Sequence, residues 1–117
     1  DIYAEIQSVR PSVKVSAAVY SSPSSSVTSV HQNALEWANT GGMDMLVPMM
    51  YFTGGSGSTW DTRLQAWLSG TDRHVIAGQI TTQGISSLLD QITLTRVRGA
   101  EGNSVFSINS FSGIFLR

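Results

Sequence analysis

The sequence predicts an α/β fold in which four parallel strands alternate with helices packed on the outside. Three observations point to this fold: short apolar runs recur, their starts lie about 30 residues apart, and helical patterns fill the intervals. The expected strands are Val13–Tyr20, Asp44–Tyr51, His74–Ile80 and Asn103–Asn109. Strands that alternate with helices pair in parallel, so their carboxyl ends form one rim, where a ligand site is expected.

Apolar residues at helical spacing predict the elements between these strands. The expected helices are Asp1–Arg10, Val27–Ala38, Asp61–Leu68 and Ile85–Val97. Pro11 closes the first of them, because proline cannot continue the hydrogen-bond ladder of a helix. Glycines follow the other three, at Gly41, Gly70 and Gly99, as is typical just past the last helical turn.

Length and composition bound the class of protein. The chain has 117 residues, whereas a complete eight-stranded barrel has about 250, and both ends interrupt apolar patterns. We therefore expect residues 1–117 to form a single partial domain. The net charge of −1 and the seven scattered Lys and Arg residues argue against nucleic acid and anionic membranes, and favour a neutral polar ligand. The chain has no Cys and no apolar run near the roughly 20 residues of a membrane span.

Three segments carry a resemblance to a known family: Ile2–Ser16, Trp37–Tyr51 and Arg73–Gly78. The most specific is Trp37–Tyr51, where a helix that ends in Trp and Gly leads into Asp, aliphatic residues, Pro and a strand-terminal Tyr. These segments resemble bacterial glycosyl-hydrolase-like proteins of the family-ten-like type, and the similarity runs along the whole chain. The resemblance implies a (β/α)8 TIM barrel, of which this chain is the C-terminal half, with strands five to eight.

The same resemblance implies a function and a location. Such proteins are mostly secreted or attached to the cell envelope, and they are thought to cleave glycosidic bonds in cell-wall or other bacterial polysaccharides. Their strongest catalytic candidates are acidic residues at the end of strand four, which would lie upstream of Asp1. The resemblance therefore implies that residues 1–117 supply part of a sugar-binding cleft without the main catalytic carboxylates.

The acidic residues of this chain offer little of their own for glycoside hydrolysis, which usually needs two carboxylates flanking the scissile bond. Three of them precede strands and belong at the opposite face of the fold, namely Asp44, Asp72 and Glu101. Asp61 follows a strand and is a weak catalytic candidate. Its alternative role is structural, in the first turn of a helix that Ser58 caps, where a negative charge suits the helix dipole.

Polar and aromatic residues at the ends of the expected strands are candidate sugar contacts. They are Tyr20, Tyr51, Gln79, Ser107 and Asn109. A phenol or amide in this position places a hydrogen-bonding group over the mouth of a barrel, although it can equally satisfy local backbone groups. Trp60 ends a glycine-rich loop and could offer its ring face to a sugar, whereas Trp37 and Trp67 lie on apolar stripes and are expected in the core.

Two further patterns, a glycine-rich loop and two histidines, give only weak signals for a binding site. The loop Gly54–Ser58 lies between a strand and a helix, where phosphates bind, but it lacks the Lys-Ser/Thr ending of a P-loop, which favours a flexible loop. His31 is expected to open a helix and His74 to open a strand, and neither has a third ligand nearby. We expect neither a metal site nor a cofactor.

Three functions remain open. The first is part of a glycoside hydrolase that acts on polysaccharide, inactive alone and completed by the missing N-terminal half of the barrel. The second is a non-catalytic, carbohydrate-binding half-barrel that pairs with a second copy, because strands Val13–Tyr20 and Asn103–Asn109 would otherwise leave apolar edges open. The third is a nucleotide-binding α/β domain, which rests on the glycine-rich loop alone.

Overall fold

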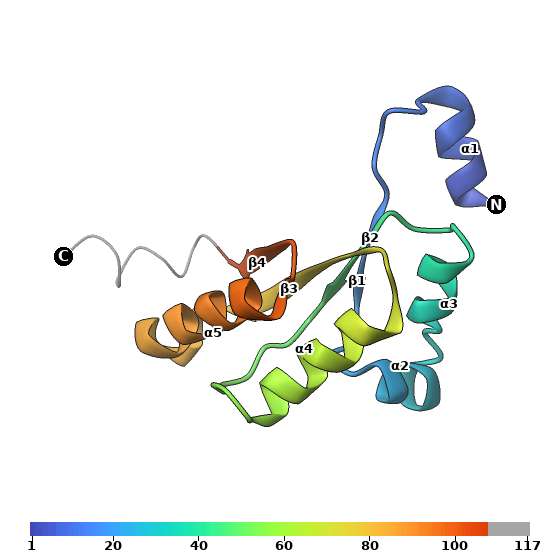
Figure 1. Cartoon of the computed structure of the whole chain (residues 1–117). Coiled ribbons are helices and arrows are strands. Elements are labelled where there is room, and N and C mark those ends of the chain that lie inside the picture. The colour runs from blue at the N-terminus through green and yellow to red at the C-terminus, as the bar shows by residue number, and fades with distance from the viewer. Residues whose placement is uncertain (108–117) are drawn as a thin grey trace.

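The computed structural model describes residues 1–107, and these form an open α/β sheet with helices (Figure 1). The elements follow one another as α1 (Ile2–Val9), β1 (Ser16–Val19), α2 (Pro23–Val30), α3 (Ala34–Asn39), β2 (Met45–Pro48), α4 (Thr59–Gly70), β3 (His74–Ile80), a short 3-10 turn (Thr81–Gln83), α5 (Ile85–Arg98) and β4 (Gly102–Phe106). The strands lie in the order β1-β2-β3-β4, and all neighbours pair in parallel. The predicted fold class is therefore confirmed, and the open sheet is consistent with half of a barrel.

The expected helix Val27–Ala38 is wrong, because two helices occupy this stretch. His31 ends α2 in the left-handed conformation, with φ of 55°, and its backbone N–H donates to the Ser26 carbonyl. Gln32 then turns its side chain toward β1 and accepts a hydrogen bond from the Tyr20 backbone N–H at 2.9 Å. His31 therefore ends a helix instead of opening one. The hydrogen bond between Tyr20 and Gln32 joins the segment after α2 to the end of β1.

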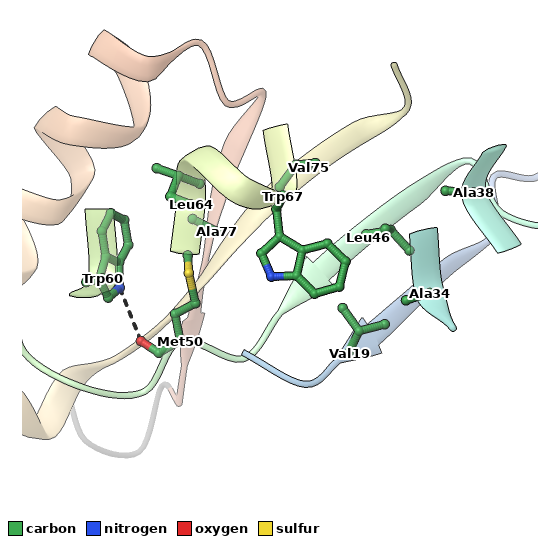
Figure 2. Packing of buried hydrophobic residues seen from close by; sticks show 10 residues of the cluster. All are labelled: Val19, Ala34, Ala38, Leu46, Met50, Trp60, Leu64, Trp67, Val75 and Ala77. Atoms are coloured by element: carbon green, nitrogen blue, oxygen red, sulfur yellow. Dashed lines mark hydrogen bonds between the residues drawn. The ribbon is translucent and has the colours of Figure 1, made fainter. Parts of the chain in front are cut away.

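The hydrophobic core lies between the helices and one face of the sheet (Figure 2). Alternate residues of each strand point into it, as the pleat requires, and the sheet contributes Val19, Leu46, Val75 and Ala77. The rest of the cluster comes mainly from helices: Ala34, Ala38, Met50, Trp60, Leu64 and Trp67. The predicted core position of Trp67 is confirmed, whereas Trp37 is only partly buried at the margin of the cluster.

The opposite face of the sheet is not covered in the same way. Its side chains alternate with those of the core and are half-buried or exposed, from Ser16 and Ala18 in β1 to Ser104 and Phe106 in β4. Between these edges lie Met45, Val47, Met49, Ile76 and Ile80, all half-buried. Within the described strands, no Lys, Arg, Asp or Glu lies on this uncovered sheet face, and its one ionisable residue is His74, which begins β3 at the amino end and lies 3.5 Å from Glu101.

Two acidic residues hold the amino ends of the strands together, where the sequence places them. Asp44 accepts hydrogen bonds from the Val15 backbone N–H at 2.9 Å and from the Tyr3 hydroxyl at 3.1 Å. The bond from Val15 lowers the pKa of Asp44 below its ordinary value. Glu101 accepts from the Val75 backbone N–H at 2.8 Å in the same manner. Both carboxylates thus tie a strand to its neighbour at the end opposite to the expected ligand rim.

Candidate functional site

Three exposed aromatic rings lie at the carboxyl ends of the strands. Tyr20 follows β1 and is 40% exposed, Tyr51 follows β2 and is 38% exposed, and Phe106 ends β4 and is 60% exposed. Tyr20 continues the alternation of Ser16 and Ala18, so it belongs to the uncovered sheet face. We call these three residues the aromatic rim.

The rings of Tyr51 and Phe106 stack on each other. Their centroids lie 5.7 Å apart and their planes differ by 18°. The two residues come from strands that β3 separates, so the stack bridges the end of β3, where Ile80 pairs with Phe106. Such a pair contributes about 0.5–1.5 kcal/mol beyond the burial of its area, which favours one shared orientation for both rings.

Phe106 was not among the residues that the sequence analysis proposed as ligand contacts. An apolar residue inside an expected strand is normally predicted to lie in the core. Only the register of β4 shows that Phe106 shares a face with Ser104, away from the helices. Asn103 points to the helices, because its side-chain oxygen accepts a hydrogen bond from the Thr95 hydroxyl at 2.9 Å. Phe106 lies three residues further along, so strand alternation places it on the uncovered face once the orientation of Asn103 is known.

Trp60 does not offer a ring face to a ligand, contrary to expectation. Its side chain is fully buried, and its indole N–H donates to the Met50 carbonyl at 3.2 Å (Figure 2). The first turn of α4 packs onto the sheet, which places Trp60 beneath the end of β2. Trp60 therefore supports the residues that precede Tyr51 instead of contacting a ligand.

The remaining predicted contacts differ in their positions. Gln79 shares the core-facing side of β3 with Val75 and Ala77 and is fully buried, and its side-chain amide has no hydrogen-bond partner among the described residues. It therefore lies under the helices, away from the rim. Ser107 directly follows Phe106 and is half-buried. Asn109 lies outside the described residues.

Asp61 is a buried partner of Arg98. The guanidinium donates to both carboxylate oxygens, at 2.9 Å from Nε and 2.7 Å from Nη2. Gly57 N–H and the Gln65 side-chain amide donate as well, at 2.8 and 3.1 Å. The hydrogen bonds from Arg98 lower the pKa of Asp61 from 3.8 to about 2, against the opposing effect of burial.

This environment gives Asp61 a structural role. Ser58 caps α4 by accepting from the Asp61 backbone N–H, as the structural alternative expects. A carboxylate with so low a pKa remains ionised at neutral pH and has no proton to give to a leaving group, and its oxygens already accept four hydrogen bonds. The Gly57 N–H of the glycine-rich loop is likewise occupied by Asp61, which supports the expectation that this loop is not a phosphate site.

An open groove lies beside the rim, between the loops that follow β2 and β3. Its volume is about 640 Å³, and it is lined by Thr53, Gly54, Gly55, Gln83, Gly84, Ile85, Ser86, Ser87 and Asp90. Gln91 joins its two walls, because its side-chain amide nitrogen donates to the Phe52 carbonyl at 2.9 Å and to the Gln83 side-chain oxygen at 3.2 Å. The lining begins at Thr53, two residues after Tyr51, and offers hydroxyl and amide groups and the Asp90 carboxylate, which can hydrogen-bond a polar ligand.

No model of a protein family matches the sequence, and no curated protein matches it closely enough to be called a relative. Within residues 1–107, no three His, Cys, Asp or Glu side chains meet as a metal site would require. In the same part of the chain, none of the helices has both the length and the apolar character needed to cross a membrane.

Proposed function

We propose that the aromatic rim binds a neutral glycan and forms part of the sugar cleft of a glycoside hydrolase that acts on bacterial cell-wall or other polysaccharide. The observation that supports this most is the exposed stack of Tyr51 and Phe106 at the carboxyl ends of parallel strands, at the end of the sheet opposite to His74. Ligands of open α/β sheets bind at these ends. Aromatic rings next to hydrogen-bonding groups suit a sugar, which has both C–H faces and hydroxyls.

The described residues serve binding in this proposal, and the acid chemistry comes from elsewhere. Asp61 is held ionised in an ion pair, and Asp44 and Glu101 are engaged at the opposite end of the sheet. In keeping with the family resemblance, the catalytic pair of carboxylates belongs to a segment upstream of Asp1, and the protein works outside the cell or in its envelope. The chain alone binds glycan without hydrolysing it.

Tyr51→Ala tests the proposal. We expect at least one of a set of neutral hexasaccharides to bind the chain by isothermal titration calorimetry, and the substitution to weaken that binding about tenfold, because it removes both the ring and the support of Phe106. Leu89→Ala removes a similarly exposed apolar side chain from α5, 54% exposed, and serves as the control. Absence of binding by every hexasaccharide, or equal weakening by both substitutions, would refute the proposal.

The uncovered sheet face favours a second candidate, a carbohydrate-binding half-barrel that associates with a copy of itself. β1 and β4 are the edges of the sheet, and the half-buried residues between them are apolar. A two-fold axis along the strands would set β4 of one copy beside β1 of the other in parallel, which closes a barrel of eight strands. Such a closure would remove both open edges.

Sedimentation equilibrium separates this candidate from the first. A self-associating half-barrel has twice the chain mass of 12.6 kDa and remains folded at micromolar concentration. Replacing Val47 by Lys on the uncovered sheet face then returns it to the mass of one chain, because a charge would be buried at the interface. A single-chain mass for the unsubstituted protein would contradict self-association and leave the first proposal standing.

A further inference from the structure

Phe106 is the outer ring of the aromatic stack, and Tyr51 lies behind it. The ring centroids lie 5.7 Å apart, so the pair is offset and each ring covers only part of one face of the other. Phe106 is 60% exposed and Tyr51 is 38% exposed, so the free face belongs mainly to Phe106. Tyr51 fixes the plane of that face and carries a hydroxyl at the edge of the stack, which can donate or accept a hydrogen bond.

A ring face of this kind selects the stereochemistry of the sugar that lies on it. The face of an aromatic ring is electron-rich and attracts the C–H groups of a flat apolar surface. A pyranose with all substituents equatorial presents such a surface, because its axial positions hold only hydrogens. An axial hydroxyl would instead be pressed against the ring without a hydrogen-bond partner, which is unfavourable.

The surroundings of the stack restrict the ligand further. The one ionisable strand residue of the uncovered sheet face, His74, lies at the amino end and is paired with Glu101, so the described strands offer no cationic partner at the rim for a carboxylate, sulfate or phosphate on a sugar. The lining of the groove includes the hydroxyls of Thr53, Ser86 and Ser87, which suit the hydroxyls of a sugar ring. Its one carboxylate, Asp90, can accept from a sugar hydroxyl and would repel an anionic group. The preferred ligand is therefore neutral as well as flat.

We propose that Phe106 is the sugar platform of this site, and that it selects neutral β-linked glycans whose pyranose rings carry only equatorial substituents, as in chains of glucose or N-acetylglucosamine. This inference rests on the proposed glycan-binding function and adds its ligand class. Tyr51 acts as a positioning residue for Phe106 and contributes its hydroxyl to the sugar.

Two hexasaccharides that differ at one carbon test the inference. Cellohexaose has all ring substituents equatorial, whereas β-1,4-linked mannohexaose differs only by an axial hydroxyl at C2. We expect the 117-residue chain to bind cellohexaose about tenfold more tightly in isothermal titration calorimetry. Phe106→Ala should abolish this preference, whereas Tyr51→Phe should preserve it and weaken binding of both sugars a few-fold, because the ring stays and one hydroxyl is lost.

The outcomes separate this inference from the function on which it rests. If neither sugar binds, nor chitohexaose, the glycan-binding function fails. If both sugars bind equally and Phe106→Ala weakens both, the rim binds glycan but does not select its stereochemistry, and the inference is overturned. A preference for cellohexaose that survives Phe106→Ala would also overturn it. Because Phe106 is exposed, its truncation should leave the far-ultraviolet circular dichroism unchanged and lower the urea midpoint only slightly, through loss of the stack with Tyr51.

Discussion

Replacing Asp61 by Asn lowers the free energy of unfolding by about 2–4 kcal/mol. Asp61 is fully buried and accepts four hydrogen bonds, two of them from the Arg98 guanidinium. The amide keeps one acceptor oxygen but turns an N–H group toward a cation, and it removes the charge that balances Arg98. Urea denaturation followed by tryptophan fluorescence measures the loss.

The pH dependence of stability provides an independent check on the same contact. The pKa of Asp61 is about 2 in the folded protein, below its ordinary value of 3.8, so folding favours the ionised form. Its stabilising contribution is complete above about pH 4 and is lost as the pH falls toward 2, and it amounts to about 2 kcal/mol. Asp61→Asn should remove this part of the acid sensitivity. Asp72→Asn, at an exposed position before β3, should retain it, and equal effects of the two substitutions would contradict the structural role of Asp61.

Replacing Trp60 by Ala destabilises the protein by about 3–5 kcal/mol, whereas Trp37→Ala has less than half of this effect. Trp60 is fully buried among core residues, and its indole N–H is bonded to the Met50 carbonyl, whereas Trp37 is only partly buried. The substitution leaves a cavity beneath the end of β2 and a carbonyl without its donor. Denaturant unfolding of both variants at pH 7 gives the comparison.

Trp60→Phe separates the contribution of the indole hydrogen bond to stability from the contribution of ring packing. The ring is largely kept, so this variant should lose about 1–2 kcal/mol, mainly from the missing hydrogen bond to the Met50 carbonyl and a small cavity. A loss from Trp60→Ala no larger than that from Trp37→Ala would mean that Trp60 faces the solvent, as its place after a glycine-rich loop suggests. The burial of Trp60 would then be refuted.

Much of the fold could be predicted because local signals and tertiary packing agree. Glycine in the left-handed conformation ends α3 at Gly41 and α5 at Gly99, and these stops follow directly from the sequence. The spacing of the apolar runs gives four strands with helices between them, and hence parallel pairing. Asp44 and Glu101 precede strands, and the structure places both at the amino ends. Each of these inferences uses residues that are close along the chain.

The errors arise where one tertiary contact decides the outcome. His31 adopts a left-handed conformation without glycine, and the Gln32 contact with Tyr20 that accompanies this break joins residues 12 apart. The burial of Trp60 depends on how the first turn of α4 lies on the sheet. The ion pair of Asp61 spans 37 residues, which periodicity cannot reveal.

The buried position of Gln79 can be predicted from strand alternation alone. It follows Val75 and Ala77 at even spacing, so strand alternation alone places it on the core side. The expectation of a rim position gave more weight to its place at the end of the strand than to this alternation. In β4 the same counting needs one tertiary contact, the hydrogen bond from Thr95 to Asn103, before it places Phe106 on the uncovered sheet face.

Mapping a bound glycan by two-dimensional 15N NMR tests the central claim most directly. On titration of the labelled chain with cellohexaose and chitohexaose, we expect the largest shifts at Tyr20, Tyr51 and Phe106 and at the neighbouring residues of the groove, Thr53 to Gly55. Shifts confined to the exposed apolar residues of α5, such as Leu89, would contradict a binding site at the carboxyl ends of the strands. A complete absence of shifts at millimolar sugar would contradict glycan binding itself.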